Sequence, residues 1–433
     1  MSAGNTNPTF EPWRYLNQVK AVYLAGSTKE PVDVSENFVS AEVFEDIFSD
    51  SVSGNIILKD TKNTIKDLKL NGADRLLIVV GDEVKGDFPL EFFVYSHSYT
   101  ALNDTSELVT LDFVTIPFIL SQNSRLWGAY KGSIHSIVSS VFDGVLSNYK
   151  SSSIDNYTPE TFELEVDNCE GILKIVSPGW TPFEMLGWLS GRATDVETSG
   201  SLFLFYQTIF DGYKFKCVEK LVKEGNIKEI DNNHIFYYGY KGSGFERNNI
   251  HTLSIGDLGD TLETTYEQFT DLWQIDLTKK KITKRSYNAE TASKPLLNER
   301  IIGQLNDKNA FDFDFPALHK KGNLKALIKN ESVLVHNGIS FYTGNSFQRK
   351  FGMLKQIQAM SVSFECFSNN QVQVGDVIEI IVPQKRGVDN KDTLKTMLDN
   401  EVSGRYLIAA KSIKYDLHEV KMQIQAIKDS ALE

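Results

Sequence analysis

Two stretches of this chain, Gly72–Ile116 and Gly375–Ile427, present similar runs of residues in the same order. In each stretch a glycine precedes an apolar run, at residues 76–80 in the first and at residues 377–382 in the second. Short apolar runs that follow a glycine are typical of buried strands. The shared order predicts a distant internal repeat of one β unit.

The correspondence continues through the following strands. Phe93–Tyr99 in the first stretch matches Leu407–Ile413 in the second. Each copy then ends in a strand whose apolar residues alternate with polar ones, so that one face is apolar. These apolar residues are Val109, Leu111 and Phe113 in the first copy, and Val420, Met422 and Ile424 in the second.

A repeat of this kind constrains the symmetry of an assembly. A ring of three chains with two similar β units each offers six nearly equivalent surfaces to a sixfold partner. Such matching suits structural assemblies better than enzymes. From the two copies, the candidate interface residues are Tyr99, Val109, Leu111, Ile413, Met422 and Ile424.

Composition limits the class of protein. A chain of 433 residues is long enough for about two to four domains. Hydrophobic residues make up 41% and charged residues 24%, which is typical of a folded chain. No apolar run approaches the ~18 to 20 residues that span a bilayer, and Met1–Phe10 is polar. We therefore expect neither a transmembrane helix nor a signal peptide.

The charge and the cysteines exclude further classes. The net charge of −12 argues against a broad basic face for nucleic acid, and three chains would carry three times −12, or −36. An acidic wall of this kind would let DNA slide past rather than hold it. Cys169, Cys217 and Cys366 are far apart and odd in number, so we expect reduced structural thiols and neither disulfides nor a metal knuckle.

The first part of the chain is predicted to be mostly β. Residues 1–19 form a polar arm that contains Pro8 and Pro12. Residues 20–118 contain short strands and are expected to form a β barrel. Thr64–Leu70 has helical spacing, and a small helix there would plug the open end of the barrel.

Residues 119–230 are expected to form a separate α/β domain. Apolar spacing over Ile134–Val145 predicts an amphipathic helix. A second helix begins with Thr181 as N-cap and Glu184 completing a capping box. Ser201–Val218 contains two strand-like runs around an Asp-Gly turn, which predicts a β hairpin.

A search for catalytic or cofactor motifs favours structural explanations. Gly239, Gly242 and Gly244 lack the Lys-Thr or Lys-Ser of a phosphate loop and predict a tight turn. No histidines have metal-helix spacing, and no Gly-x-Ser-x-Gly elbow is present. His97 is expected to pack or to line a tube wall rather than to act in catalysis. We predict no catalytic residues, no metal and no cofactor.

The alternating run around residue 313 allows two interpretations. Asp312 and Asp314 project to one side of a predicted strand and would suit a cation or acid–base chemistry. The favoured interpretation is an exposed strand whose Phe311, Phe313 and Phe315 are buried in a subunit contact. These three phenylalanines join the candidate interface residues.

Two other clusters have ordinary explanations. Lysines and an arginine crowd residues 279–285, where Ile282 interrupts them. This pattern favours a solvated strand end or a salt-bridging edge over a DNA contact. Trp180, Phe183 and Trp188 are expected in a domain core, because the polar residues of a cofactor site are missing around them.

With this pattern laid out, the chain resembles the central baseplate hub protein of contractile-tailed bacteriophages, the trimer that joins the tail tube to the cell-puncturing spike. The resemblance covers nearly the whole chain and depends on the order of several segments. These are Gly54–Lys62 with Asn63 before the turn Leu70–Gly72, Trp180–Leu189 with the hairpin Phe203–Tyr213, and the closing strands Gly404–Lys414 and Glu419–Ile427.

The resemblance implies an α+β, mainly β fold with two tail-tube-like β barrels and a lateral α/β domain. The first barrel is continuous. The second would combine residues 231–287 with 346–433 and be split by an insertion at 288–345. The loop Gln384–Gly404 and the N-terminal arm have no match in the pattern.

The resemblance also implies a role and partners. The protein would be a virion component of the tail baseplate, assembled in the cytoplasm of a bacterial host. Three copies would close a pseudo-hexameric ring that seats the spike protein on one side. The other side would nucleate the tail tube protein or a tube-initiating protein. Other baseplate proteins would bind outside, and genomic DNA would only pass through the lumen.

Two other functions compete with the hub. One is a tail-associated cell-wall hydrolase, for which the sequence offers only the weak acid pair Asp312 and Asp314. The other is a host-binding adhesin or distal tail protein, which would carry a terminal, loop-rich recognition domain. Repeated β units around an α/β domain favour the hub over both.

Overall fold

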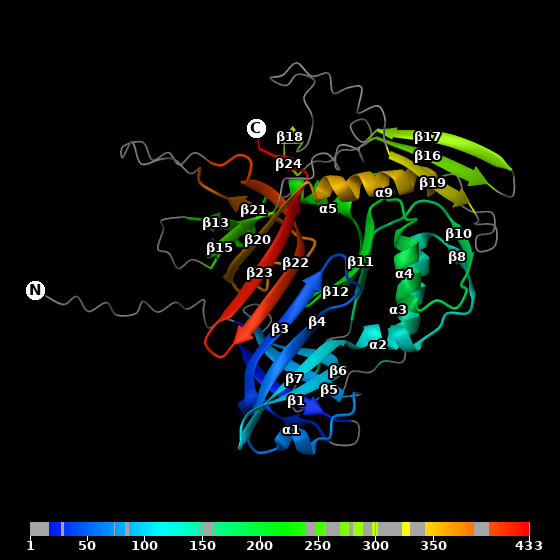
Figure 1. Cartoon of the computed structure of the whole chain (residues 1–433). Helices are drawn as coiled ribbons and strands as arrows, with labels where there is room; N and C mark the ends of the chain where they lie inside the picture. The colour runs from blue at the N-terminus through cyan, green and yellow to red at the C-terminus, as the bar shows by residue number, and fades with distance from the viewer. Residues whose placement is uncertain are drawn as a thin grey trace, which may run out of the picture.

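Most strands belong to one continuous curved sheet (Figure 1). Among the described residues this sheet has 14 strands, and its main path runs β14-β13-β21-β22-β3-β4-β7-β6-β5-β1-β2. The computed structural model describes residues 17–26, 30–72, 74–82, 86–146, 149, 154, 157–159, 162–227, 229–239, 247–256, 269–276, 280–288, 297–298, 300–301, 323–329, 343–384 and 398–432.

The first barrel is formed by the N-terminal strands, which alternate buried and exposed residues around a shared interior. Its helix α1 (Thr64–Asp67) buries Ile65 in that interior, and the C-cap residue Leu68 is buried there too, which fits the predicted plug. Its other elements are β1 (Val19–Ala25), β2 (Val32–Asp33), η2 (Ser35–Asn37), β3 (Phe38–Asp46), β4 (Ser53–Asp60), β5 (Asp74–Asp82), β6 (Gly86–Asn103) and β7 (Ser106–Thr115).

The second barrel collects strands from the last part of the chain and from a segment before the insertion. Its apolar interior is continuous with that of the first barrel, and helix α9 (Thr343–Ile357) adds Met353 and Ile357 to it. Its other elements are η3 (Asn232–His234), β13 (Ile235–Tyr238), β14 (Asn249–Ile250), β15 (Thr252–Ile255), β20 (Met360–Phe367), β21 (Val377–Ile381), β22 (Gly404–Asp416), β23 (Val420–Lys428) and β24 (Ser430–Ala431).

The internal repeat predicted from the sequence is present in the topology. Strands β5, β6 and β7 form an antiparallel meander that continues to β4, and β21, β22 and β23 form one that continues to β20. Both central strands carry a bulge at the same place, Tyr95 on β6 and Ala409 on β22. The glycines before the meanders, Gly72 and Gly375, both have positive φ, at +79° and +89°.

The lateral α/β domain lies beside the barrels (Figure 1) and has its own apolar core. Sheet β11-β12-β9 and the two-stranded sheet β10-β8 pack with α3 and α4 around it. The elements are α2 (Ile116–Asn123), β8 (Ala129–Gly132), α3 (Ile134–Leu146), β9 (Leu164–Val166), β10 (Leu173–Val176), α4 (Pro182–Ser190), β11 (Phe203–Thr208), β12 (Gly212–Cys217) and α5 (Val218–Ile227).

The local predictions for this domain agree with the structure. Helix α4 has the predicted capping box: Thr181 Oγ1 accepts a hydrogen bond from Glu184 N at 3.2 Å, and Glu184 Oε2 accepts one from Thr181 N at 2.8 Å. The hairpin β11–β12 turns at Gly212, whose φ of +81° favours glycine. Phe183 is buried in the core, with Trp180 and Trp188 packed against it.

The region around the insertion differs from the prediction. Strands β16 (Phe269–Asp276) and β17 (Lys281–Asn288) were expected in the second barrel, but they form a separate three-stranded sheet with β19 (Asn323–Lys329). The first segment of the second barrel therefore ends near β15. The residue pattern of a strand does not show which strand lies beside it, and the parallel partner β19 comes from the predicted insertion. Ile282 is 60% exposed on the edge strand β17, as expected for a solvated edge.

A short segment of the insertion is fixed to the end of the second barrel through Leu297 and Asn298. Strand β18 (Arg300–Ile301) pairs with β24. Asn298 Nδ2 donates to the Arg405 carbonyl oxygen at 3.0 Å, and Asn298 Oδ1 accepts from Arg405 N at 2.8 Å. Leu297 N donates to Asp429 Oδ1 at 3.0 Å. The second barrel thus holds this segment at the start of β22.

Asp429 makes this attachment sensitive to pH. Burial raises the pKa of its carboxyl from 3.8 to about 6. The unfolded chain titrates near 3.8, so the stability that the neutral carboxyl contributes is complete below that pH and is lost as the pH rises through about 6. Its Oδ2 has no hydrogen-bond partner within the described part of the chain.

Replacing Asp429 by asparagine should remove this dependence, because the amide stays neutral and its oxygen still accepts from Leu297 N. Between pH 4 and pH 7 the free energy of unfolding of D429N should fall by about 2 kcal/mol less than that of the wild type. Urea unfolding at four pH values tests this. Parallel pH profiles for the two proteins would contradict it.

Gly54 in β4 provides a test of barrel packing. A Cβ there would lie 2.3 Å from the carbonyl oxygen of Glu42 and 2.6 Å from Cζ of Phe113. Gly54→Ala should therefore reduce the free energy of unfolding by about 1 to 3 kcal/mol or more in urea titrations. The control is Gly144→Ala in α3, where a Cβ meets open space and alanine should stabilise by up to about 1 kcal/mol. Equal effects would refute the packing argument.

Candidate assembly surfaces

The two barrels join edge to edge through β3 and β22. These strands pair antiparallel, from Ala410 opposite Asp46 to Asp416 opposite Ser40. Strand β22 also pairs with β21 and β23, so it is shared between the junction and the second meander. The sheet crosses from one barrel to the other without a break in its backbone ladder (Figure 1).

A buried ion pair lies on this junction. Lys411 Nζ and Glu45 Oε2 are 3.2 Å apart, and both side chains are fully buried. Lys411 Nζ also donates to the carbonyl oxygen of Val372 at 2.7 Å. Glu45 Oε1 accepts from the backbone N–H of Ile209, which lies just after β11, at 2.5 Å. The pair therefore connects both barrels and the lateral domain at one point.

Among the described strands, the second half of β6 is a free sheet edge. Residues 86–94 pair with β5 on one side, whereas Tyr95–Asn103 continue beyond it and pair only with β7 among the described residues. Tyr95, Tyr99 and Leu102 are 54%, 41% and 50% exposed there. His97 contacts the ring of Tyr99 edge-on, with centroids 5.5 Å apart. Long exposed edges of this kind favour pairing with another strand.

Strand β15 forms a second free edge in the described part of the chain. It pairs with β20 on one side, from Thr252 opposite Glu365 to Ile255 opposite Val362. No other described strand pairs with it. Ile255 is 46% exposed.

The structure corrects most of the predicted interface set. Val109, Leu111, Ile413, Met422 and Ile424 are at most 1% exposed and pack in the interior of the barrels of their own chain. Alternation correctly identified an apolar face on each strand, but that face points into the barrel and is not available to a second subunit. Tyr99 is exposed on the free half of β6 and remains a predicted contact. Phe311, Phe313 and Phe315, with Asp312 and Asp314, lie outside the described residues.

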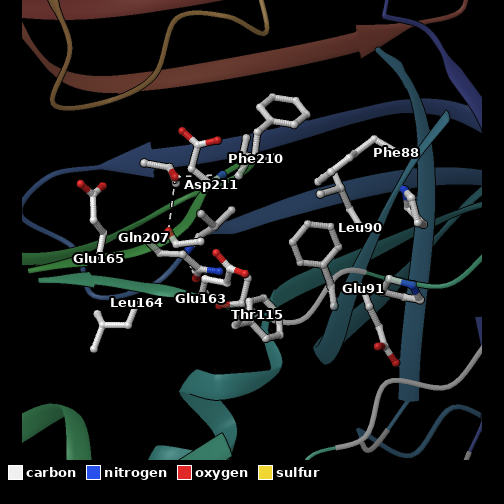
Figure 2. A pocket seen from close by; sticks show the side chains of 18 residues that line it. Phe88, Leu90, Glu91, Thr115, Glu163, Leu164, Glu165, Gln207, Phe210 and Asp211 are labelled. Atoms are coloured by element: carbon white, nitrogen blue, oxygen red, sulfur yellow. Dashed lines mark hydrogen bonds between the residues drawn. The ribbon is translucent and has the colours of Figure 1, made fainter. Parts of the chain in front are cut away.

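A cavity of about 740 Å³ lies between the first barrel and the lateral domain (Figure 2). Several of its polar side chains are engaged within the protein. Gln207 Oε1 accepts from Thr115 Oγ1 at 2.7 Å and from the backbone N–H of Val52 at 3.1 Å. Glu91 is paired with Arg75 at 3.4 Å and accepts from the hydroxyl of Tyr149. These contacts fix the lateral domain to the barrel.

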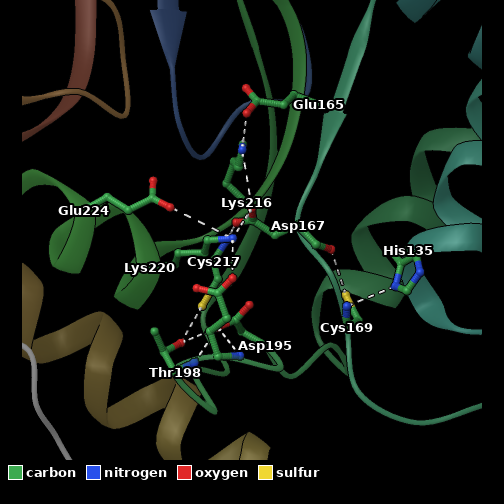
Figure 3. Close-up of polar contacts among 11 residues, drawn as sticks. His135, Glu165, Asp167, Cys169, Asp195, Thr198, Lys216, Cys217, Lys220 and Glu224 are labelled. Carbon is green, nitrogen blue, oxygen red and sulfur yellow. Dashed lines mark hydrogen bonds and ion pairs between the residues drawn. The ribbon is translucent and has the colours of Figure 1, made fainter.

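The lateral domain also contains a polar network centred on Asp167 (Figure 3). Asp167 is nearly buried, and its carboxylate lies 3.4 Å from Lys216 Nζ and 3.3 Å from Lys220 Nζ. It also accepts from the backbone N–H of Cys217 at 3.0 Å. The two lysines neutralise the buried carboxylate, so the network joins β12 and α5 to the segment after β9.

Cys169 and His135 lie together in the same domain, and their geometry does not activate the thiol. His135 Nδ1 accepts from the backbone N–H of Cys169 at 3.0 Å, while Cys169 Sγ donates to the carbonyl oxygen of Asp167. Burial raises the pKa of the Cys169 thiol to about 12, which disfavours the nucleophilic thiolate. Cys169, Cys217 and Cys366 are all buried and free.

Two further observations concern the described residues. No cluster of three or more His, Cys, Asp or Glu side chains there is arranged to hold a metal ion. None of the helices found there is long and apolar enough to cross a lipid bilayer. Within the described part of the chain, the candidate assembly surfaces are the free edges of β6 and β15.

The ion pair at the barrel junction can be tested by a double-mutant cycle. Lys411→Met leaves the buried carboxylate of Glu45 without its cation and should lower the free energy of unfolding by about 3 to 5 kcal/mol. The double variant Glu45→Gln with Lys411→Met removes both charges and retains an acceptor for the Ile209 N–H. Its loss in free energy of unfolding should therefore be clearly smaller than the summed losses of the two single variants. Additive losses in urea titrations would show that the pair is not coupled.

Comparison with known proteins identifies structures with a similar fold. No protein-family model matches the sequence, and no curated protein matches it. A tail protein from Neisseria meningitidis has a similar structure, with a TM-score of 0.53 and 9% identity over 96% of this chain and 97% of its own. The 43 kDa tail protein of prophage MuSo2 from Shewanella oneidensis gives a TM-score of 0.50 and 8% identity over 95% and 98%. The chain therefore has the fold of these phage tail proteins, mainly β with two barrels and a lateral α/β domain, as its resemblance to baseplate hubs implied.

Proposed function

We propose that this protein is a structural component of a phage-type tail and serves as its baseplate hub. In this role three copies close a pseudo-hexameric ring between the tail tube and the cell-puncturing spike. The observation that carries the proposal is the repeat of one β meander in both barrels, with the bulge at the same place. Two like units in each chain give three chains six similar positions.

The partners follow from this position. One side of the ring binds the spike protein, and the other side binds the tail tube protein or a tube-initiating protein and starts tube assembly. Other baseplate proteins bind around it in the virion, after assembly in the bacterial cytoplasm. DNA passes through the lumen without specific contacts, which suits the net charge of −12 per chain.

The protein acts without catalysis in this proposal. Its interactions would depend on backbone pairing at strand edges and on buried apolar area between subunits. The exposed apolar residues Tyr95, Tyr99 and Leu102 on a free edge support this view.

Mass photometry of the purified chain tests the proposal directly. We expect a particle of three times 48.8 kDa, and class averages of stained particles with a central hole and a sixfold outline. Pull-downs with tube and spike proteins encoded nearby should then recover both. A strict monomer over a wide range of concentrations, with no tube or spike partner, would refute the hub. Clearing of cell wall in a zymogram would instead support a hydrolase.

A further inference from the structure

The junction between the two barrels shows what can cover the free edge of β6. Strands β6 and β22 hold the same position in the two meanders, and their bulges align Tyr95 with Ala409. Residues after the bulge therefore correspond one to one, so Tyr99 corresponds to Ile413 and Ala101 to Tyr415. In β22 this part of the strand is covered by β3. In β6 no described strand covers the corresponding part.

The same comparison identifies the counterpart of β3. Strand β3 pairs with β4, which pairs with β7, and β15 pairs with β20, which pairs with β23. Following the register through these pairs, Ala41 of β3 corresponds to Leu253 of β15, and Val43 corresponds to Ile255. The edge of β3 is occupied by β22, whereas the corresponding edge of β15 has no described partner.

We propose that the second half of β6 in one chain pairs antiparallel with β15 of a second copy, and so repeats the β22–β3 junction between chains. The register follows from the internal junction. Ile413 lies opposite Val43 and Tyr415 opposite Ala41, so Tyr99 lies opposite Ile255 and Ala101 opposite Leu253 of the neighbouring chain. This inference rests on the proposed ring and names the strands that close it.

Side-chain chemistry supports this occupant. Tyr99 and Ile255 are 41% and 46% exposed in the single chain. An aromatic residue opposite a β-branched one is a favourable cross-strand pair. Their counterparts Ile413 and Val43 are fully buried in the internal junction. Pairing between chains would bury the two exposed side chains in the same way. It would also satisfy the backbone groups of both edges.

Engineered cysteines test the register. Thr100 and Ser254 are exposed and would lie directly opposite each other, with Cβ atoms about 5 Å apart. Oxidised T100C/S254C should form a covalent ladder that ends at the trimer on a non-reducing gel. The matched positive control is K414C/E42C, the equivalent pair in the internal junction, which should close within one chain and give no ladder. T105C/S254C, with one cysteine at the β6–β7 turn, is the out-of-register control.

A charge variant checks the same contact without cysteines. Tyr99→Glu places a charge in the paired edge and should shift the concentration for half-assembly upward by about tenfold or more. Tyr99→Lys with Ile255→Glu should recover assembly, because opposite charges then face each other across the junction.

The outcomes separate this inference from the hub proposal. A trimer by mass photometry without a ladder in T100C/S254C, or with an equal ladder in T105C/S254C, would overturn the strand pairing and leave the hub standing. A ladder that runs past three chains would support the pairing and overturn the closed trimer. A monomer without a ladder would overturn both.

Discussion

The buried contact between Lys411 and Glu45 is the point on which the arrangement of the whole chain depends. Each side chain alone would place an unpaired charge in the interior, and together they also bind the Val372 carbonyl and the Ile209 amide. These four residues come from both barrels and from the turn of the lateral hairpin. All of these contacts form together in one relative placement of the two barrels and the lateral domain. The pair therefore specifies the orientation of these three units more than it adds stability.

Further contacts near the ion pair hold the lateral domain in place against both barrels. Gln207 binds both Val52 and Thr115 of the first barrel, and Arg349 of α9 lies 3.8 Å from the buried Glu219 of α5. The second barrel therefore reaches the lateral domain by a second route, through α9. A chain connected in this closed cycle moves as one body more readily than as hinged domains.

Much of this fold could be predicted from the sequence where the signal is local. The capping box of Thr181 and Glu184 and the Asp-Gly turn before β12 lie within a few residues, and each specified its element. Strands β16 and β17 were expected in the second barrel but belong to a separate sheet, whose third strand β19 is distant in sequence. Alternation in β7 and β23 likewise identified a buried face without showing what buries it. The pairing of Lys411 with Glu45 has no local signal at all.

The covalent link between the barrels has a consequence for how an assembly of these chains would form and come apart. The β3–β22 junction closes within one molecule, so its formation is a step of folding and is independent of protein concentration. A contact between separate chains obeys mass action and weakens on dilution. Dilution would therefore release whole chains with their barrels still joined, never single barrels. Half of the contacts in a six-barrel ring would already exist before any two molecules meet.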